Sequence, residues 1–231
     1  MELRDIVLEE EVEEVRAFLR QFHLVYEDDI DLTLALREDG RIIATASASK
    51  NIVKDVAIDE AYQGRTLANT LMSALIKRLN QRGHHHLFLY TRPEQSEFFE
   101  PLGFNMIVES MNLTFMERGG DIERTLKTMR EAHDLGGKPK GSVVVNANPL
   151  TNGHLHLIRE AKKHHDELLV FVVSEDRSFF PFDTRFKIIE EALQDESGIT
   201  VLPTQDYLVS YATFPKYFVN APASRSLCGT N

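Results

Sequence analysis

Apolar and polar residues alternate along the first half of the chain in a pattern that predicts a mixed α/β domain. Apolar side chains recur every three or four residues over 9–22 and between Gly64 and Gly83, and this spacing predicts two amphipathic helices. The segments 32–36 and 41–48 flank Glu38-Asp39-Gly40, which predicts a hairpin. Further strands are expected at 51–58, 86–91, 105–108 and 111–115.

The second half of the chain alternates short apolar runs with helical spacing. Strands are expected at 142–147, 168–173 and 199–202, with helices at 153–164 and 184–194 between them. Such alternation implies a parallel sheet with right-handed crossovers. The glycine-rich segment 135–142 follows a polar, helical segment at 121–134 and has the composition of a linker. We therefore expect two domains, 1–137 and 138–231, in an α/β chain.

The composition and net charge of the chain argue against nucleic-acid binding and membrane insertion. The chain has 231 residues, 42% hydrophobic and 27% charged, which is ordinary for a globular protein. Its net charge of −10 argues against non-specific binding of nucleic acid, which needs a basic face. Cys228 is the only cysteine, so no disulfide can form within the chain. The N-terminal segment lacks the basic and apolar regions of a signal peptide, and no apolar run approaches the ~18 residues of a membrane-spanning helix. We expect a cytoplasmic protein that binds neither nucleic acid nor a membrane.

The most informative segment is SVVVNANPLTNGHLHLIREA, residues 142–161. Val143–Val145 form a β-branched run typical of a fully buried parallel strand, and Asn148-Pro149 ends it. The turn then delivers Thr151, Gly153 and His154 to the N-terminus of a helix. Helix N-termini present unpaired N–H groups and a positive dipole end, so a polyphosphate can bind there, and Gly153 permits its close approach.

Within this turn His154 is the candidate catalytic donor. Phosphoryl or nucleotidyl transfer is promoted by donors that stabilise the charge developing on pyrophosphate, and Thr151 adds a hydroxyl. The alternative is an ordinary N-cap Thr followed by a surface His. The position of the string between a strand and a helix of a βαβ unit favours the catalytic reading, because ligands of such units bind beyond the carboxyl ends of the strands.

Further residues in and after this turn are candidates for binding a nucleotide. Nucleotide-binding positions are expected at Asn146, Ala147, Asn148, Pro149 and Gly153. Arg185 and Lys187 lie where they could reach a phosphate, and the alternative for Arg185 is a surface residue paired with Asp183 or Glu190. The histidines at 84–86 and 164–165 lack ligand spacing with Cys or carboxylate partners, so no metal site is expected from them.

Three segments of the second half resemble the HxGH nucleotidyltransferases and, within that superfamily, the [citrate (pro-3S)-lyase] ligases. They are NANPLTNGHLHLI at 146–158, SEDRSFFPFDTRFKII at 174–189 and YLVSYATFPKYF at 207–218. Thr151 stands where many relatives have the first His. The resemblance implies a Rossmann-like C-terminal domain in which His154 and Thr151 steady the departing pyrophosphate. Backbone amides near 148–153 would hold the triphosphate.

The same resemblance implies a reaction and its partners. Acetate would be activated by ATP, with Mg²⁺, to acetyl-adenylate, and the acetyl group would pass to a thiol. That thiol belongs to the phosphoribosyl-dephospho-CoA group on the acyl carrier protein of citrate lyase. The resembling ligases continue for roughly another hundred residues beyond this chain, including a motif that completes the ATP site. We therefore expect the C-terminal domain to be incomplete.

The first half resembles the GCN5-related N-acetyltransferase fold, from DVAIDEAYQGRTLANTLMSALI at 55–76 followed by LFLYTRPEQSEFFEPLGF at 87–104. In that family a glycine-rich loop wraps the pyrophosphate of acetyl-CoA, and the matching positions here are Gln63, Gly64, Arg65, Thr66, Leu67 and Ala68. Thr66 replaces the middle glycine, so we expect little binding of acetyl-CoA. Recognition of a pantetheine-bearing protein by this fold is the favoured role.

Three rival functions remain at this point. One is an adenylyltransferase of the pantetheine-phosphate or nicotinamide-mononucleotide kind, which shares the T-x-G-H motif. Another is a plain N-acetyltransferase with a degenerate appendage. The last is a non-catalytic fragment that only binds the acyl carrier protein. Pyrophosphate release separates them, because it depends on acetate for the ligase and on a phosphorylated acceptor for the adenylyltransferase.

Overall fold

A computed structural model describes residues 1–62, 65–175, 179–208, 210 and 213. The chain divides into two compact units, Met1–Leu126 and Lys127–Asn231, which we call the front unit and the back unit. The division lies within helix α4 (Ile122–Ala132), upstream of the expected boundary at 137/138, which stays a prediction. In the described part of the chain, no helix has the length and apolar character needed to cross a membrane.

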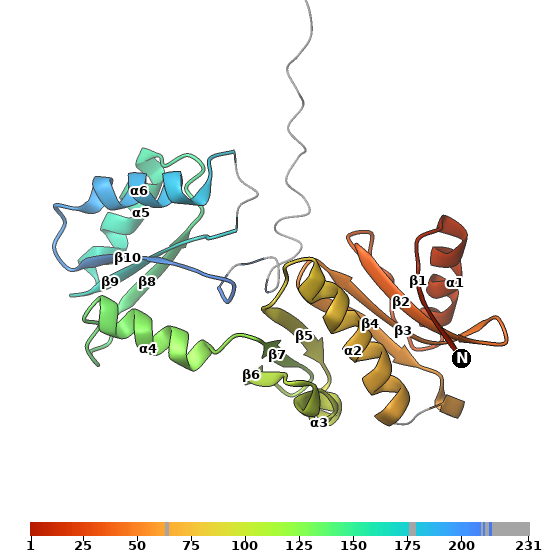
Figure 1. Cartoon of the computed structure of the whole chain (residues 1–231). Coiled ribbons are helices and arrows are strands. Elements are labelled where there is room, and N and C mark those ends of the chain that lie inside the picture. The colour runs from red at the N-terminus through yellow and green to blue at the C-terminus, as the bar shows by residue number, and fades with distance from the viewer. Residues whose placement is uncertain (63–64, 176–178, 209, 211–212, 214–231) are drawn as a thin grey trace, which may run out of the picture. The chain divides into compact units, whose positions relative to one another are not determined.

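The front unit is a seven-stranded sheet with helices on it (Figure 1). Its strands are β1 (Glu2–Asp5), β2 (Leu32–Glu38), β3 (Arg41–Ser49), β4 (Ile52–Ile58), β5 (Leu87–Thr91), β6 (Asn105–Glu109) and β7 (Thr114–Arg118). The order is β1-β2-β3-β4-β5-β7-β6, and only the β4 and β5 pair is parallel. The main helices are α1 (Glu9–Arg20) and α2 (Arg65–Gln81), and α3 (Ser96–Phe99) is a single turn.

Helix α2 covers one face of this sheet because its leucines repeat every fourth residue. Leu71, Leu75 and Leu79 are fully buried against alternate residues of β2, whose Leu32, Leu34 and Leu36 point the same way. Helix α1 buries Val15, Phe18 and Leu19 in a separate cluster with Ala57 of β4. The helices and strands expected from periodicity are therefore confirmed, within one or two residues at most ends.

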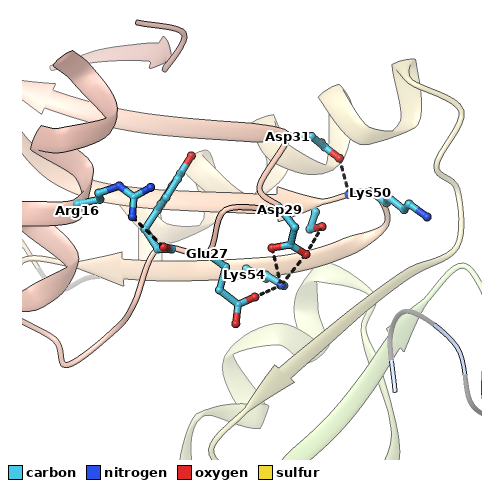
Figure 2. A network of polar contacts seen from close by, with 8 residues as sticks. Arg16, Glu27, Asp29, Asp31, Lys50 and Lys54 are labelled. Carbon is cyan, nitrogen blue, oxygen red and sulfur yellow. Dashed lines mark hydrogen bonds and ion pairs between the residues drawn. The ribbon is translucent and has the colours of Figure 1, made fainter. Parts of the chain in front are cut away.

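Polar side chains occupy part of the front sheet. Thr45, Ser47 and Ser49 of β3 are buried and alternate with the alanines that face α2. In the segment before β2, Glu27 and Asp29 contact Lys54 of β4 (Figure 2). Ser49 Oγ donates to Asp29 Oδ2 at 2.9 Å. Hydrogen bonds of this kind satisfy hydroxyls that would otherwise be buried without partners.

Asp55 is the exception within this polar face. It lies in β4 with a φ of +52°, near an irregularity in the pairing with β3, and its Oδ2 atom is buried without a hydrogen-bond partner in the described structure. Burial raises the pKa of this carboxyl to about 6, although Lys54 acts in the opposite direction. Asp55 therefore weakens the folded state when it is ionised.

The back unit is a three-stranded parallel sheet, ordered β10-β9-β8, with two helices packed on it (Figure 1). It runs β8 (Gly141–Val145), α5 (Asn152–Lys163), β9 (Leu168–Val172), α6 (Phe182–Leu193) and β10 (Ile199–Pro203). Ile158 of α5 and Ile189 of α6 share one buried cluster with Val170 of β9, so both helices cover the same face. The predicted strand–helix alternation and parallel sheet are confirmed.

Three expectations need correction. Val144 is 40% exposed because it points away from the face that α5 and α6 cover, so the predicted full burial of Val143–Val145 is wrong. Strand β7 begins at Thr114 rather than Met111, since Ser110 and Leu113 close a turn. Strand β1 was not expected, because its four residues are mostly polar and exposed.

Candidate functional site

The carboxyl ends of the three parallel strands in the back unit carry polar residues. Asn146–Asn148 follow β8, Ser174 and Glu175 follow β9, and Thr204–Asp206 follow β10. Hydrogen bonds join two of these ends: Ser174 N donates to Thr204 Oγ1 at 2.9 Å, and Gln205 N donates to Ser174 Oγ at 2.9 Å. Sequence reasoning missed Ser174 and Thr204, although the position of a polar residue directly after each strand would have indicated them.

The turn after β8 ends in a capped helix. Thr151 is the N-cap of α5, its Oγ1 accepts from His154 N at 3.5 Å, and the His154 side chain accepts in return from Thr151 N. This is a reciprocal capping box with histidine in the usual place of Glu or Gln. The capping role that the sequence offered as an alternative is therefore present, and it also fixes the position of the His154 ring.

The capping box decides which ring nitrogen of His154 carries the proton. The backbone N–H of Thr151 can only donate, and it lies 3.1 Å from Nδ1, so Nδ1 accepts. Thr151 Oγ1 lies 2.8 Å from the same atom. In the neutral ring the proton then resides on Nε2, which has no hydrogen-bond partner in the described part of the chain. His154 can thus present one N–H donor to a ligand.

Gly153 leaves open space beside this donor. A Cβ built on Gly153 would meet only Thr151 Oγ1, at 3.6 Å. Because α5 begins at Asn152, the amides of Asn152 and Gly153 have no acceptor inside the helix. They point out of the helix N-terminus, where the dipole is positive. The turn therefore offers backbone amides, a hydroxyl and an imidazole donor to an anion.

Two asparagine side chains of the turn are fixed by their oxygens. Asn148 Oδ1 accepts from Phe180 N at 3.0 Å, and Asn146 Oδ1 accepts from Arg185 Nη1 at 3.0 Å. The first contact assigns the amide orientation of Asn148, so its Nδ2 group points elsewhere as a donor. Ala147 between them is buried and has a φ of +47°, and Pro149 follows through a cis peptide bond. The predicted residues 146–149 thus lie together beside the N-terminus of α5.

Arg185 is not the surface ion-pairing residue that the sequence offered as an alternative. It is 1% exposed, so it is not a surface residue of α6, and its guanidinium lies 5.8 Å from the Phe182 ring centroid. Each of its three nitrogens donates to a main-chain oxygen. A direct contact with a phosphate stays a prediction. Lys187, by contrast, is exposed and pairs with Glu191 at 3.9 Å.

The acyl-CoA loop expected in the front unit is described only in part. Gln63 and Gly64 lie outside the described residues, as does the side chain of Arg65. Thr66 is exposed in the first turn of α2, Leu67 packs on the core, and Ala68 is buried. Among the described residues, no three histidines or carboxylates form a group that could hold a metal ion. Most of the segment 207–218 also lies outside the description.

Comparisons with known proteins match two family models to different parts of the chain. Residues 7–114 match the acetyltransferase (GNAT) domain, and residues 140–227 match the citrate lyase ligase C-terminal domain. The "[Citrate [pro-3S]-lyase] ligase" of Escherichia coli (strain K12) is 33% identical over 219 residues, which is 94% of this chain and 62% of that protein. Most of this chain is therefore similar in sequence to citrate lyase ligases, and its second half matches the C-terminal domain of that family.

Other relatives extend this finding. The citrate lyase ligase of Haemophilus influenzae is 33% identical over 207 residues, covering 89% of this chain and 62% of that protein. This chain therefore spans less than two thirds of the length of these ligases. The "Phosphopantetheine adenylyltransferase" of Lactococcus lactis subsp. cremoris is 44% identical over 52 residues, covering 22% of this chain and 31% of that protein. The back unit is accordingly a nucleotidyltransferase-like domain, and it follows a GNAT-like domain in the sequence.

Proposed function

We propose that this chain takes part in ATP-dependent activation of acetate and acetylation of a thiol on the acyl carrier protein of citrate lyase. The proposal is supported by the citrate lyase ligases that match most of the chain. The observation that carries it is the open donor set at the N-terminus of α5, with the His154 ring oriented by Thr151. That set suits the triphosphate of an ATP–Mg²⁺ substrate.

The chemistry of the first step needs little covalent work from the protein. A carboxylate oxygen of acetate attacks the α-phosphorus of ATP, the bond from that phosphorus to the bridging oxygen breaks, and pyrophosphate leaves. Negative charge grows on the leaving group, where the His154 Nε2 donor and the amides of Asn152 and Gly153 would stabilise it. Asn146, Ala147, Asn148 and Pro149 shape the binding turn. Mg²⁺ would share the phosphate charge and bind mainly through the phosphates.

The second step transfers the acetyl group. The thiol of the phosphoribosyl-dephospho-CoA group attacks the carbonyl carbon of acetyl-adenylate, AMP leaves, and the thiol proton passes to solvent. We assign recognition of the pantetheine-bearing carrier protein to the GNAT-like front domain. The exposed Thr66 side chain in the first turn of α2 argues against acetyl-CoA as the acetyl source.

Exchange of labelled pyrophosphate into ATP tests the proposal, with acetate present or omitted. His154→Ala should lower the acetate-dependent exchange rate about 10²- to 10³-fold, because it removes one electrostatic donor. His156→Ala is the matched control, since His156 is exposed two residues further along the same helix. Equal exchange by the wild-type chain and the His154→Ala variant would rule out the proposed role of His154.

A second function is favoured by one observation, the short matches to phosphopantetheine adenylyltransferases. In that case pyrophosphate would be released from ATP only when 4′-phosphopantetheine is supplied, and acetate would have no effect. The same exchange assay with each acceptor in turn therefore distinguishes an acetate-activating ligase from an adenylyltransferase. Turnover of acetyl-CoA without release of pyrophosphate would support an N-acetyltransferase instead.

A further inference from the structure

The buried guanidinium of Arg185 connects the segments that surround the anion-binding turn. We propose that Arg185 is a positioning residue, which holds the turn 146–153 in its binding geometry without itself touching the nucleotide. This inference rests on the proposed function only in naming ATP as the ligand. The role of Arg185 in shaping the turn stands on the contacts of the back unit alone.

The contacts of Arg185 account for all three of its nitrogen atoms. Nε donates to Phe180 O at 2.9 Å, and Nη2 donates to Glu175 O at 3.2 Å. Nη1 lies 2.9 Å from Val173 O, 2.9 Å from Asn146 O and 3.0 Å from Asn146 Oδ1. A side chain that is 1% exposed and binds these oxygens acts through the backbone it holds.

The acceptors belong to segments that follow different strands. Asn146 follows β8, Val173 and Glu175 follow β9, and Phe180 lies just before α6. Phe180 is held twice, because its N–H donates to Asn148 Oδ1 while its carbonyl accepts from Arg185. A chain of hydrogen bonds thus runs from Asn146 through Arg185 and Phe180 to Asn148, with an asparagine of the turn at each end.

Lysine cannot reproduce this arrangement. The guanidinium is a planar fork whose N–H groups point in fixed directions to oxygens on several sides, whereas an ammonium is a single point with three donors. Arg185→Lys keeps the charge but leaves some of the buried carbonyls without partners. The turn 146–153 should then sample other conformations. An anion that needs its amides aligned should bind more weakly.

Hydrogen exchange of the ligand-free full chain tests the structural part. In Arg185→Lys, the hydrogen-bonded amides of Thr151, His154 and Phe180 should exchange at least tenfold faster than in the wild type, while amides of the central strand β9 change little. Arg159→Lys is the matched control, because Arg159 of α5 is 52% exposed and pairs with Glu196 at 2.8 Å. Uniform acceleration throughout the back unit, or none in the turn, would overturn the proposal.

Equilibrium binding of ATP–Mg²⁺ tests the consequence. We expect Arg185→Lys to raise the dissociation constant 10- to 100-fold at a temperature where the variant is folded, and Arg159→Lys to leave it unchanged. Wild-type affinity in a variant with a loosened turn would contradict the positioning role. If wild type binds ATP but shows no acetate-dependent exchange, the proposed reaction fails while this inference is still decided by binding.

A second variant covers the case in which Arg185→Lys does not fold. Asn146→Ala removes one acceptor, Oδ1, and leaves the main-chain contacts of Arg185 in place. It should accelerate exchange of the Thr151, His154 and Phe180 amides several-fold. The measurement is made without ligand, so a direct contact between Asn146 and a nucleotide cannot cause the change. Unchanged exchange in the turn would count against the proposal.

Discussion

Replacing Gly153 with alanine should separate folding from anion binding, because the two respond in opposite directions. Gly153 is the second residue of α5 and has ordinary helical backbone geometry. Its new Cβ would meet only Thr151 Oγ1, at 3.6 Å, which is normal van der Waals contact. Alanine in place of a helical glycine stabilises by up to about 0.5–1 kcal/mol, and the first turn should give the lower part of that range.

Binding should change by more than stability does. The methyl group would stand in the open space beside the Asn152 and Gly153 amides, where we place a phosphate oxygen. Loss of one hydrogen bond to a charged group costs about 1.5–3 kcal/mol, which corresponds to roughly 10- to 100-fold weaker ATP binding. The variant should therefore melt at the same or a slightly higher temperature and bind ATP–Mg²⁺ less well by calorimetry.

The control is Gly137→Ala, which makes the same chemical change where a Cβ meets nothing within 4 Å. It should alter neither ATP affinity nor the melting temperature by much. If Gly153→Ala keeps wild-type affinity, the anion does not approach this turn, and the nucleotide site has been placed wrongly. A marked loss of stability would instead show that the N-terminus of α5 is tighter than described.

Three further predictions concern the front unit. Because burial holds the pKa of Asp55 at about 6 when folded, the folded chain keeps a proton that the unfolded chain has lost, and stability falls as pH rises from about 4 to about 6. Asp55→Asn should remove that fall and stabilise by about 1 kcal/mol at pH 7.5 in urea unfolding, whereas Asp28→Asn, at a 97% exposed side chain, should not. Gly119→Ala should destabilise far more than Gly83→Ala in thermal unfolding. Both glycines have positive φ, but only at Gly119 would a Cβ lie 2.1 Å from the His85 carbonyl oxygen. Calorimetry with acetyl-CoA should show little binding to the wild-type chain and more to Thr66→Gly, and tight wild-type binding would revive the acetyltransferase function.

Much of the architecture could be predicted from local sequence. The leucines of α2 are spaced by four, and short apolar runs alternate with helical spacing after residue 140. The side-chain periods of the helix and the strand are enough to predict these elements. Thr151 and His154 are three residues apart, so they occupy the N-cap and N3 positions of one helix. Their mutual capping is a local contact, so the motif alone indicated where both side chains would lie.

Long-range contacts explain what sequence reasoning missed. Strand β1 pairs with β2 through residues about thirty positions apart, and its mostly exposed side chains carry no hydrophobic signal of their own. The left-handed conformation of Asp55 in β4 likewise depends on the irregular pairing with β3. Neither feature has a signal in a window of a few residues.

Arg185 shows the same limit at the candidate site. Its sequence neighbourhood, an amphipathic helix with charged residues, is equally compatible with a surface ion pair. Only the folded back unit brings the carbonyl of Asn146, 39 residues away, to its guanidinium. The sequence by itself determined the helix, the strand and the cap, because these depend on neighbours within a turn or two. The tertiary structure decided the burial of Arg185 and the orientation of Asn148, because a buried charge is tolerated only where distant oxygens converge to accept its hydrogen bonds.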